Sequence, residues 1–231
     1  MENHPESYSS FYTEKNLGLD LLLVQRGYQQ FKPYFKGNTC LELGPATGYM
    51  TKNLVEDFEF VTVIEGSESL IRQIPDYPNL TKIHSLFEDY ETEHRFDTII
   101  INHVLEHIEH PVSLLQSISK WLSPDGVIIL GVPNSKSFHR LAAVKIGLLN
   151  TENELNERDK ELGHYRVYDF DLLRKHLSDA GFNIIAEGGV FLKFLSNQQT
   201  VEYLSEGIID AYFKLGEEFK NNAAEIFIVA Q

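Results

Sequence analysis

The sequence predicts a doubly wound α/β sheet, because short apolar segments alternate with helix-like segments through most of the chain. The apolar segments are unbroken rather than alternating in polarity, which is typical of parallel strands buried on both faces. The helix, strand, helix, strand order at the end of the chain predicts that the sixth and seventh strands close the sheet as a hairpin. The predicted strands cover residues 39–43, 60–65, 80–84, 96–102, 126–132, 182–186 and 225–229.

Helical spacing of apolar residues predicts the intervening elements. The predicted helices cover residues 17–35, 47–56, 68–74, 111–122, 169–180 and 201–219. We expect residues 1–36 to form an N-terminal helical segment and residues 37–231 to form the main domain. The alternation of strand-like and helix-like segments stops at about 135–168, where an apolar patch precedes a charged stretch. This break predicts an insertion near the strand ends that acts as a lid.

Composition narrows the class of partner. The chain has 231 residues, of which 42% are hydrophobic, enough for a sizeable core. Its net charge of −14 argues against nucleic acid or an anionic membrane surface as a partner. The sequence contains no stretch of about 18 uncharged apolar residues, so we expect no membrane span. The N-terminus is polar, so we expect no secretory signal. The single cysteine, Cys40, reads as a buried thiol. We therefore expect a cytoplasmic protein that acts on a small molecule, with its oligomeric state left open.

A glycine turn follows the first predicted strand. Gly44-Pro45-Ala46-Thr47-Gly48 opens the first helix of the main domain, where glycine permits a tight turn and close approach of a ligand to the backbone. Glu65 ends the next strand, 21 residues after Gly44, and an acidic side chain there can bind both hydroxyls of a ribose. A nicotinamide dehydrogenase would need glycine at positions 44, 46 and 49, and this chain has Ala46 and Tyr49. Glu42 also suits a cationic ligand better than a pyrophosphate.

These residues resemble motif I of the class I S-adenosylmethionine-dependent methyltransferases, D/E-x-G-x-G-x-G, with Ala46 at the middle glycine. The likeness spans about residues 39–190 and places its matching segments in the family's order. The stretch 104–111, Val-Leu-Glu-His-Ile-Glu-His-Pro, is similar to ubiquinone-type small-molecule O-methyltransferases. Trp121-Leu122-Ser123-Pro124-Asp125-Gly126 and Gly163-His164-Tyr165-Arg166 continue the match.

The resemblance implies a Rossmann-like, seven-stranded sheet that is mostly parallel with an antiparallel last strand. It implies S-adenosylmethionine as cofactor and methyl transfer to a small-molecule acceptor, for which we expect a hydroxyl group. The matching positions that the family uses for its cofactor are Glu42, Gly44, Pro45, Ala46, Thr47, Gly48, Glu65, Gly66, Ser67, Leu86, Phe87, Asn102 and His103.

Two histidines are candidates for catalysis. A hydroxyl acceptor needs a base, and His107 or His164 could serve because imidazole titrates near neutral pH. The alternative for each is a structural role in its loop. Tyr8, Phe11 and Tyr12 could close over the cofactor, or belong to an unstructured tail.

Two other readings of the sequence remain. His103-Val104-Leu105-Glu106-His107 fits the H-x-x-E-H pattern of a zinc peptidase, which requires this segment to lie within a helix. Because it directly follows a strand-like run and Pro111 lies just beyond it, we expect no metal site. A non-catalytic, cofactor-binding regulatory domain is the second alternative.

Overall fold

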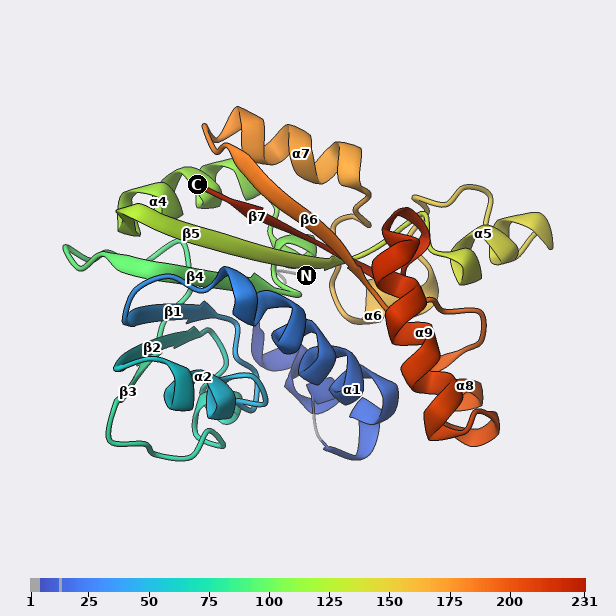
Figure 1. The fold of residues 1–231 in the computed structure, drawn as a ribbon, viewed down its shortest axis with the longest axis horizontal. Helices are drawn as coiled ribbons and strands as arrows, with labels where there is room; N and C mark the ends of the chain where they lie inside the picture. The colour runs from blue at the N-terminus through green and yellow to red at the C-terminus, as the bar shows by residue number, and fades with distance from the viewer. Residues whose placement is uncertain (1–4, 13) are drawn as a thin grey trace.

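A seven-stranded mixed sheet forms the centre of the computed structural model, which describes residues 5–12 and 14–231 (Figure 1). The strand order is β3-β2-β1-β4-β5-β7-β6. β7 lies antiparallel between β5 and β6, and the neighbouring pairs among β1 to β5 are parallel. The predicted architecture is confirmed, including the antiparallel pairing of the last two strands. The strands are β1 (Thr39–Leu43), β2 (Phe60–Glu65), β3 (Leu80–His84), β4 (Phe96–Asn102), β5 (Leu122–Pro133), β6 (Ile184–Val190) and β7 (Glu225–Ala230).

Helices cover both faces of the sheet (Figure 1). One face packs against α1, α2 and α9, and the other against α4 and α7. The α-helices are α1 (Glu14–Phe31), α2 (Thr51–Asp57), α3 (Glu68–Ile71), α4 (Pro111–Trp121), α5 (Phe138–Lys145), α6 (Glu157–Glu161), α7 (Phe170–Asp179), α8 (Asn197–Tyr203) and α9 (Glu206–Glu218). Four short 3-10 helices complete the described fold, namely η1 (Pro5–Tyr12), η2 (Lys32–Tyr34), η3 (Leu105–His107) and η4 (Lys220–Asn222). Within the described residues, every helix is too short or too polar to cross a membrane.

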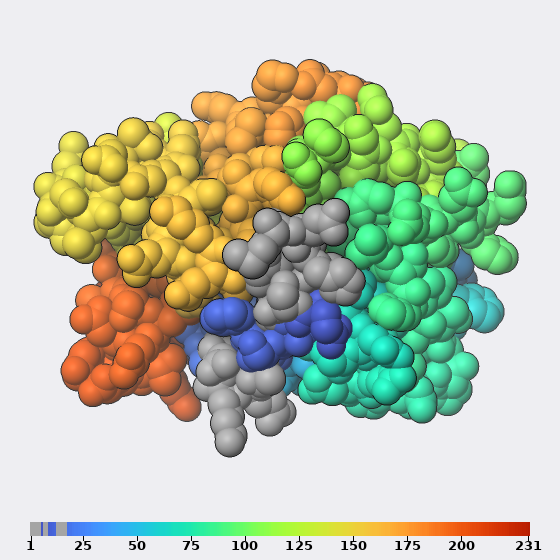
Figure 2. Space-filling view, turned by 180° about the vertical axis from the view of Figure 1, so that it is seen from behind, coloured from blue at the N-terminus to red at the C-terminus, as the bar shows by residue number. Residues whose placement is uncertain are grey.

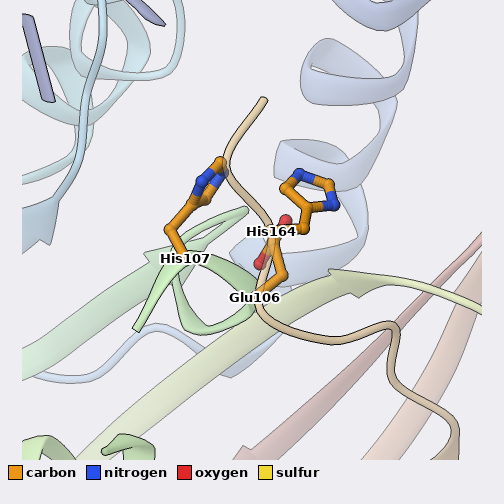
Figure 3. A group of neighbouring side chains, drawn as sticks. All are labelled: Glu106, His107 and His164. Carbon is orange, nitrogen blue, oxygen red and sulfur yellow. The ribbon is translucent and has the colours of Figure 1, made fainter. Parts of the chain in front are cut away.

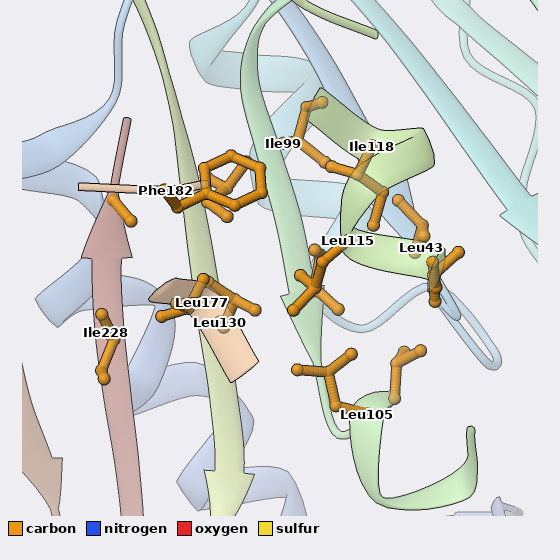
Figure 4. Packing of buried hydrophobic residues seen from close by; sticks show 14 of the residues in the cluster. Leu43, Ile99, Leu105, Leu115, Ile118, Leu130, Leu177, Phe182 and Ile228 are labelled. Carbon is orange, nitrogen blue, oxygen red and sulfur yellow. The ribbon is translucent and has the colours of Figure 1, made fainter. Parts of the chain in front are cut away.

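The strands are apolar at successive positions because helices cover both faces of the sheet. In β4, Ile99 and Ile101 pack into the cluster beneath α4 and α7, whereas Ile100 packs into the cluster beneath α1 and α2. Leu115 and Ile118 of α4 lie over the strand side chains in the first cluster (Figure 4). Because successive side chains point to opposite faces, both sets of positions must be apolar.

Several predicted boundaries differ from the structure, and three of these differences have a clear local cause. The predicted helix 47–56 begins only at Thr51, because the turn before it holds residues with positive φ, including Gly48 at 83°. The predicted helix 201–219 is two helices, since the chain is extended at Leu204 and Ser205. β6 runs later than predicted and includes Gly188, where a Cβ atom would lie 2.1 Å from the Phe227 ring.

The insertion lies beyond the carboxyl end of β5, on the right in Figure 1. It carries α5 and α6, and one buried side chain joins its parts. Arg140 donates to the backbone carbonyls of Glu152 and Glu154 and to the carboxylate of Asp159. The guanidinium of Arg140 therefore links α5, the loop after it and α6.

Candidate active site

A cavity of about 820 Å³ lies at the carboxyl edge of the parallel strands. The turn after β1 and the ends of β2 and β4 form one part of its wall, and the insertion forms another. Phe11 and Tyr12 of η1 also line it. Figure 2 shows this N-terminal segment, in blue, lying between the yellow insertion and the blue-green chain around α3. Ligands of open α/β sheets bind outside the carboxyl ends of the strands, so this cavity is the candidate site.

The glycine turn has the conformation that its sequence predicts. Gly44 has φ +64°, and a Cβ atom there would lie 2.7 Å from Val104 Cγ2. Ala46 also has a positive φ of 49°, which is uncommon for a residue with a side chain. A hydrogen bond stabilises that conformation, because the Ala46 N–H donates to Glu65 Oε2 at 3.1 Å. The other oxygen of Glu65 accepts from the Ser67 N–H at 2.9 Å.

Most of the predicted cofactor-binding residues line one part of the cavity. These are Glu42, Gly44, Pro45, Ala46, Thr47, Glu65, Gly66, Leu86, Phe87, Asn102 and His103. Gly48 and Ser67 do not belong to the lining. Gly48 packs against Ile74, and Ser67 caps α3 by accepting a hydrogen bond from the Leu70 N–H.

The charge of Glu42 differs from the sequence expectation of a fixed negative group. Its carboxyl is buried and accepts a 2.6 Å hydrogen bond from Thr51 Oγ1. Burial raises the pKa of Glu42 to about 7, against the opposing effect of the Thr51 hydrogen bond. Part of the population is therefore protonated at neutral pH, and a nearby cationic ligand would favour the charged form.

His103 lies between two carboxylates. Its Nε2 is 3.0 Å from Glu225 Oε1, and its Nδ1 is 3.4 Å from Glu106 Oε1. Burial disfavours a charged ring, but Glu225 and Glu106 together raise the pKa of His103 well above its usual value. His103 also has a positive φ of 56°, which turns the backbone sharply between β4 and η3. The segment 103–107 is thus not an α-helix, which the zinc-peptidase alternative requires.

The two predicted catalytic histidines meet in the cavity. The rings of His107 and His164 are in edge-to-face contact with centroids 4.6 Å apart. Figure 3 shows the Glu106 carboxylate between them in projection. Burial and the neighbouring His164 lower the pKa of His107 to about 4, against the attraction of Glu106. His107 is therefore a neutral imidazole at neutral pH, and the Tyr12 hydroxyl lies 3.5 Å from its Nε2.

Three charged side chains of the site have no place in the sequence prediction. Glu225 starts β7, and Arg140 and Asp159 form a buried ion pair in the insertion with an N···O distance of 2.9 Å. Each acts on a residue that is distant along the chain, so spacing alone gave no signal. The carboxylate of Asp159 also receives the Asn156 N–H as part of a capping box, which the Asn-x-x-Asp spacing could have indicated.

Comparison with known proteins shows which family the chain resembles. The profile of a family described as a methyltransferase domain matches residues 21–187. A 132-residue region is 27% identical to (S)-coclaurine N-methyltransferase of Papaver somniferum and covers 53% of this chain and 38% of that protein. A 120-residue region is 23% identical to the mitochondrial ubiquinone biosynthesis O-methyltransferase of Schizosaccharomyces pombe and covers 48% of this chain and 44% of that protein. These regions span less than half the length of either curated relative.

Solved methyltransferase structures have a similar fold. A structure described as an S-adenosylmethionine-dependent methyltransferase of Thermotoga maritima superposes with a TM-score of 0.69 at 17% identity, and covers 99% of both chains. Because the family profile matches most of the chain, the chain belongs to the methyltransferase-domain family.

Proposed function

We propose that this protein transfers a methyl group from S-adenosylmethionine to a hydroxyl group of a small molecule. The observation that carries the proposal is that one cavity holds both the glycine turn with Glu65 and the pair His107 and His164. The family, and a fold neighbour described as S-adenosylmethionine-dependent, support the donor. The two curated relatives act on nitrogen and on oxygen by name. The neutral ring of His107 can accept a hydrogen bond from a hydroxyl group, which favours oxygen.

The residues present fit the donor. Each oxygen of Glu65 accepts one backbone hydrogen bond and keeps a second lone pair for a ribose hydroxyl. The buried hydroxyl of Thr47 has no hydrogen-bond partner among the described residues, and Thr47 lines the cavity. The absence of a side chain at Gly44 keeps the turn open to a ligand. This part of the cavity therefore offers acceptors, a donor and backbone access where an adenosyl group needs them.

The protein's part in the reaction is positioning. When bound, S-adenosylmethionine supplies a methyl group on a sulfonium that needs no further activation. Glu65 holds the nucleoside, and the turn at Gly44–Ala46 fixes the methionine portion. His107 accepts a hydrogen bond from the acceptor hydroxyl through its neutral ring and takes up the hydroxyl proton on methyl transfer, and His164 lies beside it. Tyr12 and the insertion restrict water, so donor and acceptor can be held in line.

The domain organisation also becomes part of the proposal. We infer that the insertion at 135–168 is a lid and that the N-terminal segment is its counterpart, because both line the cavity from outside the sheet. Phe11 and Tyr12 occupy the predicted covering position, whereas the side chain of Tyr8 lies outside the described part of the chain.

The test is transfer of a labelled methyl group. The purified protein is incubated with S-adenosyl-[methyl-¹³C]methionine and a small-molecule extract, and products are identified by mass spectrometry. A labelled O-methyl product is expected, whereas a labelled N-methyl product would overturn the hydroxyl assignment. Binding of S-adenosylhomocysteine without any labelled product would favour the regulatory alternative.

A further inference from the structure

We propose that Glu106, His107 and His164 bind a divalent transition-metal ion of the zinc class. One ligand atom from each of the three side chains lies within 4.8 Å of the others. The two rings are already in edge-to-face contact, and Figure 3 shows the carboxylate between them in projection. Small side-chain rotations would bring these atoms to the separations of about 3–3.5 Å that ligands adopt around a zinc ion at about 2.1 Å.

The carboxylate of Glu106 lacks the partners that burial demands. Glu106 is only 1% exposed, and neither of its oxygens meets a hydrogen-bond donor in good geometry within the described part of the chain. The nearest cationic group, Nδ1 of His103, is 3.4 Å away and is shared with Glu225 through its other nitrogen. A buried carboxylate without hydrogen bonds is costly, and a bound cation removes that cost.

Neighbouring groups orient both histidines. Nδ1 of His164 lies 3.5 Å from Asp159 Oδ1, and Asp159 is itself held by Arg140 and by the Asn156 N–H. The His107 ring has a hydrogen bond with the backbone of Leu162. Histidines that bind metals commonly direct one ring nitrogen to a carboxylate or carbonyl and leave the other for the ion.

The ligand types select the metal. Two imidazoles and one carboxylate suit zinc and its first-row neighbours, whereas magnesium and calcium prefer oxygen ligands alone. The sequence predicts no metal site here, because the H-x-x-E-H segment, which pairs His103 with His107, directly follows a strand-like run. The structure instead pairs His107 with His164 from the insertion, and only the fold reveals that pair.

Three protein ligands leave a coordination position open, and all three residues line the cavity. On the proposed function, an oxygen of the acceptor would fill that position, and the metal would then hold the acceptor in place of a direct hydrogen bond to the histidine. This last step rests on the proposed function, but metal binding by the three side chains does not.

The experiment measures zinc binding to the full-length, tag-free protein without donor or acceptor. Chelator-treated protein is titrated with zinc sulfate by calorimetry in a competing buffer, and bound zinc is counted by plasma mass spectrometry. We expect about one zinc per chain. Loss of an orienting neighbour usually weakens a site 10–100-fold, so Glu106→Gln and His164→Ala should each weaken binding by more than about 100-fold. The matched control His94→Ala removes an exposed histidine and should bind zinc as the wild type does.

Stoichiometry well below one, or equal zinc binding by His164→Ala and the wild type, would overturn the site. If Glu106→Gln does not fold, the visible absorption spectrum of the wild-type protein loaded with cobalt tests the site instead. The visible absorption of a four- or five-coordinate ion is expected, and the spectrum of hexaaquo cobalt would contradict the proposal. Calorimetry with S-adenosylhomocysteine on the same samples tests the proposed function separately, so failure of one does not imply failure of the other.

Discussion

The carboxylate of Glu65, at the end of β2, accepts a hydrogen bond of 3.1 Å from the backbone N–H of Ala46 in the turn after β1. This bond joins neighbouring parallel strands at their carboxyl ends. Glu65 therefore shapes the turn and also offers acceptors to a ligand in the cavity. Although hydrogen bonds from Ser67 and Ala46 oppose it, burial raises the pKa of Glu65 above its usual value.

Replacing Glu65 should weaken cofactor binding. Glu65→Ala removes both ribose acceptors and the bond to Ala46, so we expect a loss of about 1–3 kcal/mol, which is roughly 5- to 150-fold in dissociation constant. Calorimetric titration with S-adenosylhomocysteine measures it. The control is Glu68→Ala, at an exposed position of α3. Unchanged affinity in Glu65→Ala would exclude the ribose role.

Replacing His107 should affect turnover rather than cofactor affinity. His107 meets His164 and lies near Tyr12 but is not part of the glycine turn. Positioned side chains of this type commonly contribute about 10²–10⁴-fold, so His107→Ala should slow methyl transfer by a factor in that range. Initial rates on the labelled acceptor, with S-adenosylhomocysteine affinity measured in parallel, make the comparison. His110→Ala, at an exposed position, should leave both unchanged. A normal rate in His107→Ala would make the ring structural.

The sheet could be predicted because its signals are local. Unbroken apolar runs marked the parallel strands, and the glycine turn marked the first strand–helix junction. Boundaries were lost where tertiary packing decides, as at Gly188, whose missing side chain makes room for the Phe227 ring. Local sequence propensity carries no information about a packing partner such as Phe227, which lies almost 40 residues away from Gly188.

The cofactor end of the site was also predictable, whereas the acceptor end was predictable only in part. The motif named Gly44 and Glu65 because each sits at a fixed offset from a strand. The sequence predicted His107 and His164 as separate candidates, but it did not predict that their rings are in contact. The ion pair of Arg140 and Asp159 depends on how the insertion folds back on itself, for which the sequence offers no periodic pattern.

Asp97 should make stability depend on pH. Its carboxylate accepts hydrogen bonds from the N–H groups of Asn38 and Thr39 and from Thr39 Oγ1, at 2.9–3.1 Å. Partial burial acts in the opposite sense, but these bonds lower the pKa of Asp97 below its usual value. The folded state then binds fewer protons than the unfolded state. The stabilisation is fully present above the unfolded pKa of about 3.9 and is lost as pH falls through the lower folded value.

Urea unfolding of the wild type and Asp97→Asn checks this expectation. The variant should be less stable by about 1–3 kcal/mol at pH 7, as for lost hydrogen bonds to a charged group. The difference should shrink as pH falls below about 4. Asp125→Asn, at an exposed position near the start of β5, serves as the control. A difference that stays constant down to pH 2.5 would mean that the Asp97 charge contributes nothing.

The insertion should loosen when its guanidinium is removed. Arg140 is 5% exposed and joins the backbone at Glu152 and Glu154 to the carboxylate of Asp159. Arg140→Met keeps the length of the side chain but leaves Asp159 buried without its cation, and breaking a buried pair in this way costs about 3–5 kcal/mol. Because Arg140 and its partners lie outside the two hydrophobic clusters of the sheet, that cost should appear as local opening. Hydrogen exchange at 150–164 should quicken while exchange in β1 and β4 stays slow. Lys145→Ala, at an exposed position of α5, should change neither. Global unfolding of Arg140→Met, with β4 exchanging as fast as the insertion, would show that the segment is part of the folding core and not a lid that can open separately.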